Sequence, residues 1–544
     1  MLLTALKTYD RSQFVKDVTA GIIVAIIALP LSIALALASG VGPEAGIFTA
    51  IVAGFVISAL GGSSVQIAGP TAAFATIVAG IVARDGMDGL VIATVLAGIF
   101  LILMGIFHFG SLIKFIPYTI TTGFTSGIAV TIVIGQLKDF FGVTYPEGVR
   151  PIETMEKLEA FAENIGTINW AAVLVGVVSL AILIISPMVL KKIPGSLIAV
   201  IVGILMVQFL PLKVSAIGNL YTISNALPSF HLPVVTFETV KAAVPNAFTI
   251  AVLAAIESLL SCVVADGMIN GKHRSDMELV AQGAGNIASA LFGGIPATGA
   301  IARTAANIKN GGRTPVAGMV HSITLVIVLV VLMPYAGMIP MPTIAAILFV
   351  VAYNMCQWRT FKQLVETAPK SDILVLVVTF ALTVIFDLVV AIEIGMILAC
   401  LLFIKRMSEE TKAESWVYAD DDSAAVNDDL RKLPKEIRVY EISGPLFFGA
   451  SDIIAHIVVE DFAKSLVLRM RAVNALDSTA MNALIHLTKA CESKGVTVVF
   501  SHVNEQPMKV MEKAKFKELA GEENFCPNIT AALERAEKIA GARA

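Results

Sequence analysis

The chain has 544 residues, of which 56% are hydrophobic and 15% are charged, and its formal net charge is −3. A soluble protein of this length needs several domains and far more charge, so the composition excludes an ordinary soluble protein and indicates a polytopic membrane protein. The small net charge points to no charged partner, and the sequence contains no nucleic-acid-binding signature.

The N-terminal residues are polar and charged, without the apolar core and cleavage site of a removable signal peptide. From about residue 18 to residue 404, apolar segments follow one another, and most are long enough to cross a bilayer as a helix. We expect roughly fourteen spans, seven in each half. They fall near 19–38, 45–60, 65–83, 90–107, 118–136, 169–190 and 196–212, and near 244–263, 277–292, 298–309, 315–333, 342–356, 371–386 and 389–404.

Lysine and arginine mark the cytoplasmic loops of membrane proteins. With the N-terminus inside, alternate threading of the spans places the basic residues between them on the cytoplasmic side, together with both termini. These residues are Lys114, Lys191, Lys192, Lys272, Arg274, Lys309, Arg313, Arg359, Lys362, Lys370, Lys405 and Arg406. The acidic loop 139–168 then lies outside. Because each half holds an odd number of spans, the halves face opposite ways, which is the inverted repeat of many transporters.

The third segment of each half begins with a pair of glycines and is interrupted by proline. These segments read GGSSVQIAGPTAAFATIVAG from Gly61 and GGIPATGAIARTAANIKNGG from Gly293. Proline suits the first turn of a helix and not the middle of a straight span. We therefore expect each segment to be an extended stretch followed by a half-helix that starts inside the membrane. In an inverted repeat, the two half-helices point their N-termini at each other.

Two opposed helix N-termini bring free N–H groups and the positive ends of two helix dipoles to one place. Such a place attracts an anion without many basic side chains, and the small residues Ala72, Ala73, Gly299 and Ala300 let a solute approach the backbone. The alternative is that the glycines and alanines only allow helices to pack closely. The matched positions of the two segments favour the anion site.

Three further side chains belong to the same region. Arg303, one turn into the second half-helix, could add positive charge for the anion, reach the membrane surface, or hold a backbone carbonyl at the helix break. Glu257 lies in the apolar run FTIAVLAAIESLLSCVVA, where a carboxylate is costly and is usually kept for function. Ser261 follows four residues later on the same helix face. Glu257 and Ser261 could carry a proton, help to coordinate sodium, or make a structural hydrogen bond to a neighbouring helix.

The composition changes after Lys405 and Arg406. Residues 407–435 form an acidic stretch that is typical of a solvated linker, and residues 436–544 alternate strand-like and helix-like patterns. We therefore divide the chain into a transmembrane domain over 1–406, the linker, and a small α/β domain. The five cysteines have no metal-ligand spacing, so we expect buried thiols in a reducing compartment and neither a metal site nor a cofactor.

Over nearly its whole length the chain resembles a known family. The stretch FVKDVTAGIIVAIIALPLSIALALASG, followed by AGPTAAF, resembles the opening of the SulP sulfate-permease family, bacterial relatives of the solute carrier 26 anion transporters. The stretches IESLLSCVVADGM and GGIPATGAIARTAANIKNGGRTPVAG resemble its second half. Within these, GPTAAF, IESLL, DGM and ATGAIARTAANI are most similar to the bacterial C4-dicarboxylate branch.

The resemblance implies an α-helical membrane protein with core and gate domains of seven-plus-seven inverted repeats, and a solute held between the third and tenth spans. Glu257 and Ser261 take positions at which a sodium-coupled bicarbonate branch has a sodium-binding acid and hydroxyl. Here the acid is glutamate and not aspartate, which favours protons over sodium. The predicted substrate-binding residues are Thr71, Ala72, Ala73, Phe74, Thr298, Gly299, Ala300, Ile301, Ala302 and Arg303.

The C-terminal domain resembles the STAS domain that ends most of these proteins. By this resemblance IRVYEISGPLFFGASD gives two strands and the first helix, SLVLRMRAV a strand, NALDSTAMNALIHLTKAC a loop and helix, and VTVVFSHV the next strand. Asp477, Ser478 and Thr479 fall where related domains carry a phosphorylatable serine. We favour a helix cap by Asp477 or Ser478 over a regulatory phosphate at Ser478.

These arguments predict a secondary active transporter of the bacterial inner membrane. We expect proton-coupled uptake of C4-dicarboxylates (succinate, fumarate, aspartate) or of sulfate by alternating access. The alternatives are a sodium-coupled bicarbonate transporter, an anion exchanger, an anion channel on the same fold, or a membrane sensor that signals through the STAS domain. The resemblance also implies a homodimer and a cytoplasmic protein partner for the STAS domain. Because no hydrolase or kinase motif is present, we expect no enzymatic activity.

Overall fold

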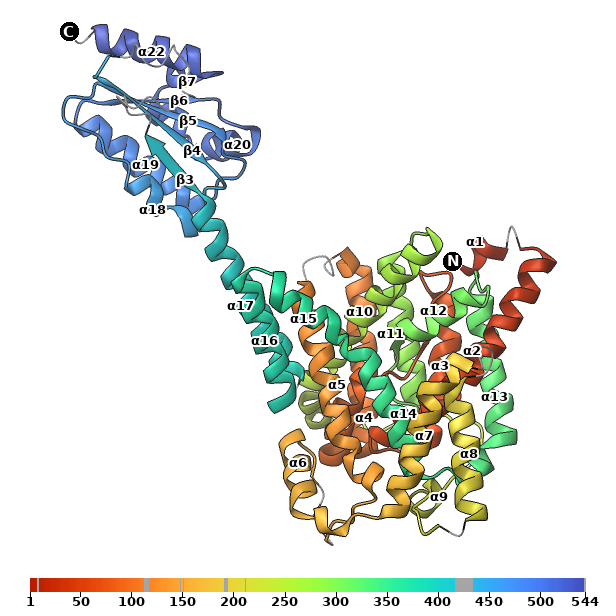
Figure 1. Ribbon diagram of the computed structural model, residues 1–544. Helices are drawn as coiled ribbons and strands as arrows, with labels where there is room; N and C mark the ends of the chain where they lie inside the picture. The colour runs from red at the N-terminus through yellow and green to blue at the C-terminus, as the bar shows by residue number, and fades with distance from the viewer. Residues whose placement is uncertain are drawn as a thin grey trace. The chain divides into compact units, whose positions relative to one another are not determined.

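The computed structural model describes the chain except for residues 7–8, 112–116, 147, 150, 190–193, 211, 387, 416–433 and 543–544. Lys114, Lys191 and Lys192, which entered the orientation argument, and most of the expected linker lie outside the described residues. The chain forms two compact units, Met1–Met396 and Ile397–Ala544, and each has its own architecture (Figure 1).

The first half of the membrane unit is a series of apolar helices. Asp10 caps helix α2 by accepting a hydrogen bond from the backbone N–H of Gln13 at 2.7 Å. Gly86, with φ of 72°, interrupts α4 and divides it into the third and fourth spans. The helices are α1 (Leu2–Leu6), α2 (Arg11–Ala38), α3 (Pro43–Leu60), α4 (Ala75–Ile106), α5 (Tyr118–Phe141), α6 (Thr154–Glu163), α7 (Trp170–Val189), α8 (Gly195–Phe209) and α9 (Ile217–Leu220).

The second half repeats the pattern. Its helices are α10 (Phe237–Ile269), α11 (Ser275–Leu291), α12 (Ile301–Lys309), α13 (Val316–Ala336), α14 (Met341–Cys356), α15 (Trp358–Thr367), α16 (Lys370–Ile385) and α17 (Leu388–Glu410). Each of the expected spans coincides with one of these helices when the two parts of α4 are counted separately. Within the described residues, eight helical stretches are long and apolar enough by themselves to cross a membrane.

The packing of the membrane unit shows the inverted repeat. Helix α4 packs against α10 and α11 of the second half, and in the mirrored arrangement α13 packs against α2 and α3 of the first half. Helix α5 packs against α16, just as α14 packs against α7, and α5 and α14 pack against each other. The helices therefore form one group around α4 and α13 and a second group around α5 and α14, as the core and gate arrangement predicts.

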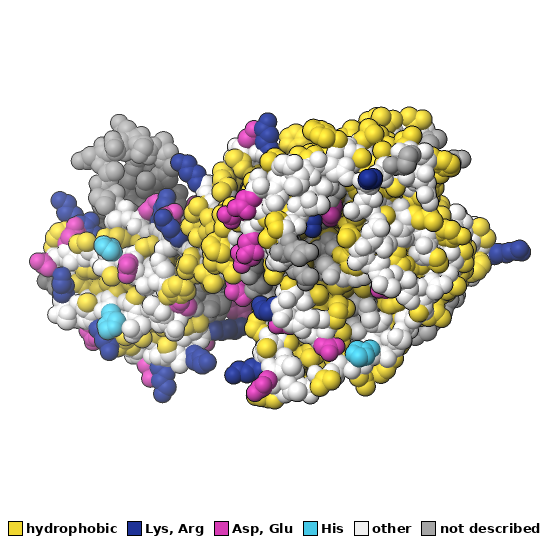
Figure 2. Space-filling view, turned by 90° about the horizontal axis from the view of Figure 1, so that it is seen from below, with side chains coloured by type: hydrophobic (Ala, Val, Ile, Leu, Met, Phe, Trp, Pro, Cys, Tyr) yellow, Lys and Arg dark blue, Asp and Glu magenta, His cyan; other side chains and the backbone are white. Residues whose placement is uncertain are grey.

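The surface and the ends of the membrane unit fit a bilayer protein. Large hydrophobic side chains such as Trp170, Phe209 and Phe237 are exposed, and Figure 2, seen from below, shows hydrophobic side chains gathered along much of the rim of the membrane unit. Such a surface would be unfavourable in water and is expected against lipid. Helices α6 and α9 lie at one end of the bundle, and α1 and α15 lie toward the other (Figure 1). The acidic loop that contains α6 is thus opposite the N-terminal helix, as the threading predicts.

The C-terminal unit is a five-stranded sheet with helices on both faces. The strands follow the order β3-β4-β5-β6-β7, and β3 is antiparallel to β4 whereas the other neighbours are parallel. A hydrophobic core lies on each face of the sheet, and alternate residues of β5 point into one core or the other. Leu466 and Leu468 face α19, and Val467 faces α22. The elements are β3 (Lys412–Ser415), β4 (Ile437–Ser443), β5 (Ser465–Ala472), β6 (Thr497–Ser501), β7 (Phe525–Cys526), α18 (Asp452–Ala455), α19 (Ser478–Ser493), α20 (Glu505–Lys513), α21 (Phe516–Ala520) and α22 (Ile529–Ala542).

Two details of this unit differ from the expectation. The stretch from Ile437 to Asp452 gives one strand and not two, so that prediction was wrong. Gly444, with φ of 95°, and Pro445 end the strand, and the following phenylalanines enter a short 3-10 helix at Phe448–Ala450. In addition, the first part of the expected linker joins the sheet, because β3 pairs with β4.

Candidate anion-binding site

The two interrupted segments meet as a pair of short strands. β1 (Ala68–Gly69) and β2 (Thr298–Gly299) are antiparallel, with Ala68 opposite Gly299 and Gly69 opposite Thr298. The backbone N–H of Ala300 extends the pairing by donating to the Ile67 carbonyl at 2.9 Å. The breaks predicted from glycine and proline are therefore confirmed, and backbone groups of one half satisfy those of the other, as a non-helical segment inside a membrane protein requires.

A helix begins directly after each of these strands. Thr71 precedes the 3-10 turn Ala72–Phe74 that leads into α4, and Ala300 precedes α12. Neither helix start receives a hydrogen bond from a capping side chain. Both starts therefore keep backbone N–H groups available, and the β1–β2 pair holds them close to each other. This geometry is the one that attracts an anion through backbone donors and helix dipoles.

The predicted site residues divide into accessible and buried ones. Thr71 and Ala300 are half-buried, and Ile301 and Ala302 are exposed. A solute can therefore reach the side chains of these four. The remaining predicted residues are enclosed by protein and can contribute only through backbone or electrostatic effects; they are Ala72, Ala73, Phe74, Thr298, Gly299 and Arg303.

Glu257 lies against the first helix start. Its carboxylate Oε2 accepts a hydrogen bond from the Thr71 hydroxyl at 2.9 Å, across a sequence separation of 186 residues. Helix α10, which carries Glu257, packs against α4, α12 and β2, so it borders both half-helices. The carboxyl group is therefore in direct contact with the residue that begins the first of them.

Ser261 and Ser258 tie the same helix to the second segment. Ser261 is buried and donates to the Thr304 hydroxyl at 3.4 Å, so it faces α12. Ser258, which the sequence argument did not single out, shares a 2.6 Å hydrogen bond with the Thr298 hydroxyl and accepts from the Gly299 backbone N–H at 3.1 Å. Its signal in the sequence was only its position next to Glu257.

Of the roles predicted for Arg303, the structure shows that it holds a backbone carbonyl at the helix break. The side chain is only 1% exposed, and its Nη2 donates to the Pro70 carbonyl at 2.9 Å. Among the described residues, its Nε and Nη1 have no hydrogen-bond partner. Arg303 therefore fixes the residue that precedes Thr71, where the extended segment turns into a helix. Its electrostatic contribution to an anion stays a prediction.

Helix α11 holds both extended segments, and the sequence argument missed this. The buried Glu278 accepts from the backbone N–H groups of Gly62 and Ser63 at 2.8 and 3.1 Å, and from the side-chain amides of Gln66 and Gln282 at 2.9 Å each. Two turns later, Asn286 exchanges a pair of hydrogen bonds with the backbone of Ala297, at 2.8 and 2.9 Å. The spacing of 278, 282 and 286 places these polar groups on one helix face, which was the available signal.

The second glycine of the first pair is needed for close approach. A β-carbon on Gly62 would lie 2.0 Å from the Arg274 carbonyl oxygen, whereas one on Gly80 of α4 would meet no atom within 4 Å. We expect Gly62→Ala to lower the unfolding free energy by about 1–3 kcal/mol, because backbone must move to admit the methyl group. Gly80→Ala is the matched control and should leave thermal unfolding of the purified protein nearly unchanged. Equal losses in the two variants would show that close packing at Gly62 is not required.

A cavity of about 580 Å³ adjoins the first part of α4. Thr76, Gly80 and Arg84 line it from α4, and side chains of α5, α6 and α16 line it from the other side. Thr76 is five residues beyond Thr71, so this face of α4 leads from the helix start toward the end of the bundle that carries α6. The space therefore separates the helix group around α4 from the group around α5.

In the C-terminal unit, Asp477 is the helix cap. Its carboxylate accepts from the backbone N–H of Ala480 at 2.9 Å and from that of Phe448 at 2.8 Å. Ser478 is the first residue of α19 and is exposed. The favoured prediction of a cap is thus confirmed for Asp477, and the Ser478 hydroxyl remains accessible.

We expect Asp477→Ala to cost about 1 kcal/mol locally, because two backbone donors lose their acceptor. Hydrogen exchange of the Ala480 and Phe448 amides in the full-length protein should then accelerate by roughly fivefold. Ser478→Ala is the control, since no described contact depends on that hydroxyl, and it should not change the exchange. A larger effect of Ser478→Ala than of Asp477→Ala would contradict this assignment.

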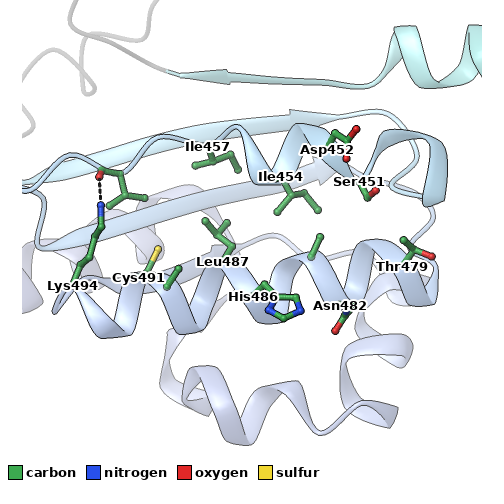
Figure 3. A pocket seen from close by; sticks show the side chains of 14 residues that line it. Ser451, Asp452, Ile454, Ile457, Thr479, Asn482, His486, Leu487, Cys491 and Lys494 are labelled. Carbon is green, nitrogen blue, oxygen red and sulfur yellow. Dashed lines mark hydrogen bonds between the residues drawn. The ribbon is translucent and has the colours of Figure 1, made fainter.

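A groove of about 490 Å³ runs between α18 and α19 (Figure 3). Ile454, Ile457 and Leu487 form its apolar floor, and Lys494 closes one end by donating to the Val459 carbonyl at 3.4 Å. Burial raises the pKa of the Cys491 thiol in this groove to about 11, so the thiol is neutral and behaves as a small hydrophobic group.

Known protein families match both parts of the chain. The model of the sulfate permease family matches residues 14–379, and that of the STAS domain matches residues 431–532. The putative sulfate transporter YvdB of Bacillus subtilis is 39% identical over 531 residues, which cover 95% of this chain and 97% of that protein. The bicarbonate transporter BicA of Picosynechococcus is 32% identical over 517 residues, covering 92% and 90%.

Solved structures show the same folds. The transmembrane domain of a cyanobacterial bicarbonate transporter BicA matches with a TM-score of 0.63 and 29% identity, over 72% of this chain and 98% of that one. The structure of SLC26A9 matches with a TM-score of 0.86 and 20% identity, over 99% and 93%, and shows a shared fold for both units. The chain therefore belongs to the sulfate permease family: it is a multi-pass membrane anion transporter with a C-terminal STAS domain, and not an enzyme.

Proposed function

We propose that this protein is a secondary active transporter that couples the uptake of a small anion to protons by alternating access. The observation that supports the coupling is the hydrogen bond between Thr71 and Glu257. It joins a titratable group to the helix start at which the anion is predicted to bind. Glu257 and Ser261 are the coupling residues of this proposal.

The hydrogen bond suggests how a proton and an anion assist each other. When Glu257 is ionised, the Thr71 hydroxyl donates its hydrogen to the carboxylate. When Glu257 takes up a proton, the carboxyl group can donate to the Thr71 oxygen instead, and the Thr71 hydrogen becomes available to the anion. The same proton removes a negative charge beside the anion. Each ligand therefore strengthens the binding of the other.

The substrates we propose are C4-dicarboxylates (succinate, fumarate, aspartate) or sulfate. The uncapped helix starts at Thr71 and Ala300 offer backbone N–H donors, which suit carboxylate and sulfate oxygens alike. The name of the relative from Bacillus subtilis favours sulfate. Movement of the helix group around α4 against the group around α5 would open the 580 Å³ cavity as part of the route.

Uptake into proteoliposomes tests this proposal. Labelled sulfate, succinate, fumarate and aspartate are offered with and without an inward proton gradient. We expect at least one of them to accumulate only when the gradient is imposed, and accumulation to disappear when an ionophore collapses it. Uptake that ignores the proton gradient and follows sodium would refute proton coupling. Large single-pore currents without coupling would indicate an anion channel.

Bicarbonate is the second candidate, because BicA proteins are similar over nearly the whole chain. In that function Glu257 and Ser261 would help to hold sodium. Bicarbonate uptake that requires sodium and is independent of a proton gradient would establish it. Obligatory exchange of one anion for another would instead identify an exchanger.

The remaining assignments follow from the same family. We propose the bacterial inner membrane as the location, with both termini in the cytoplasm, and domain boundaries near residues 406 and 435. We also propose a homodimer, which light scattering of the purified protein would test.

The exposed Ser478 would be the phosphorylation site, and a cytoplasmic protein would bind the STAS domain. Mass spectrometry of the protein from its own cells tests the phosphate.

A further inference from the structure

Helix α15 lies between two membrane spans without being one itself. The backbone of Gln357, with φ of 46°, turns the chain between the end of α14 at Cys356 and the start of α15 at Trp358. Helix α16 then begins at Lys370. Because both neighbours are spans of the bundle, the helix that joins them lies where the bundle meets the membrane surface. Figure 1 shows α15 toward the end that carries α1.

One side of α15 faces the protein. Phe361 packs against Phe380 of α16, with ring centroids 5.4 Å apart, and Leu364 on the same side is partly buried. The Ser126 hydroxyl of α5 donates to the Cys356 carbonyl at 2.6 Å and fixes the preceding turn. The helix is therefore held in one orientation, and its outer face has a defined composition.

The outer face carries an apolar stripe beside basic side chains. Trp358 and Val365, seven residues apart, are exposed by 46% and 41%. The indole N–H of Trp358 donates to the hydroxyl of Tyr353 on α14 at 3.2 Å, so the stripe continues onto an exposed aromatic side chain of the neighbouring span. Arg359 and Lys362 follow the stripe around the helix and are exposed. The Arg359 guanidinium lies 5.6 Å from the centre of the Trp358 ring system.

We propose that the outer face of α15 is a binding surface for anionic phospholipids of the surrounding bilayer. Trp358 and Val365 would enter the region between headgroups and acyl chains, and Arg359 and Lys362 would contact lipid phosphates. Tryptophan and tyrosine favour this depth, and amphipathic helices with basic side chains bind there in proportion to the anionic lipid present. The continuity with Tyr353 favours lipid over a soluble phosphate or a second copy of the chain.

Fluorescence of Trp358 tests whether this face meets lipid. The sequence has three tryptophans, at 170, 358 and 416, so Trp170→Phe with Trp416→Phe leaves Trp358 alone. Reconstituted in vesicles whose acyl chains are brominated near the headgroup, this variant should lose about half of its emission. Emission that is unchanged by the brominated lipid would overturn the proposal. It would indicate that a protein surface, and not lipid, covers the outer face of α15.

A charge-matched pair of variants tests the preference for anionic lipid. In phosphatidylcholine vesicles, added phosphatidylglycerol should raise the unfolding temperature of the native protein. Arg359→Gln with Lys362→Gln should reduce this rise by about half or more. Lys213→Gln with Lys241→Gln, which removes the same charge from exposed positions elsewhere on the membrane unit, should leave it unchanged. Equal responses of the two double variants, or a rise reproduced by inorganic phosphate alone, would overturn the proposal.

Discussion

Replacing Glu257 with glutamine is expected to abolish accumulation of the anion driven by a proton gradient, by about 100-fold or more. The amide keeps the shape and can still hydrogen-bond to Thr71, but it cannot exchange a proton. Exchange of labelled for unlabelled anion should persist, because the helix starts that would bind the anion are unchanged. Both fluxes are measured in the same preparation of proteoliposomes.

Glu238→Gln is the control for this result. Glu238 lies on the same helix, in its exposed first turn, and has no contact with Thr71. Its replacement should leave both fluxes as they are in the native protein. If Glu257→Gln also left gradient-driven accumulation intact, the carboxyl would be structural, and the coupling group would have to be sought elsewhere.

Replacing Glu278 with alanine is expected to lower the unfolding free energy by about 3 kcal/mol or more, which is the largest loss of stability that we expect from a single exchange. The carboxylate accepts four hydrogen bonds in a site with no access to solvent. Without it, the N–H groups of Gly62 and Ser63 remain buried and unpaired, at about 1–3 kcal/mol each. The thermal unfolding temperature of the full chain in detergent measures the effect.

Glu278→Gln refines this test, because glutamine keeps one acceptor oxygen but presents an N–H₂ group to other donors. We expect a loss smaller than that of alanine and still clearly measurable. Glu366→Ala is the control, since Glu366 is exposed and its 3.7 Å ion pair with Lys362 should contribute less than about 1 kcal/mol. A Glu278→Ala protein as stable as this control would contradict the view that α11 holds the extended segments.

The helix breaks were predictable because they are encoded locally. Gly61 with Gly62, and Gly69 with Pro70, are incompatible with a straight span, and so are the matching residues from Gly293 onward. The sequence predicted that Thr71 and Glu257 lie in the same region, but it did not predict the hydrogen bond between them, because 186 residues separate the two partners. Hydrophobic periodicity locates spans, but it carries no information about which helix accepts a given hydrogen bond.

Two other features show where sequence reasoning ends. Glu278, Gln282 and Asn286 were overlooked because α11 was expected to be an ordinary span. Only its packed position shows that one polar face of the helix bonds to both extended segments. The phenylalanines after Pro445 were assigned to a second strand by the resemblance to the STAS domain, but Gly444 adopts a left-handed backbone and ends the ladder. In that case a single backbone conformation outweighed the preference of the residues that follow it.

The hydrogen bonds by which α11 holds the two extended segments have a consequence for the direction of transport. Because Glu278 holds one extended segment, Asn286 holds the other, and β1 pairs with β2, the donor groups keep their spacing as the whole assembly shifts. Under the alternating access proposed above, a solute arriving from either compartment would meet the same arrangement of donors. The dissociation constant of the anion should then be similar on the two sides of the membrane, and reversing the driving gradient should reverse the direction of net transport.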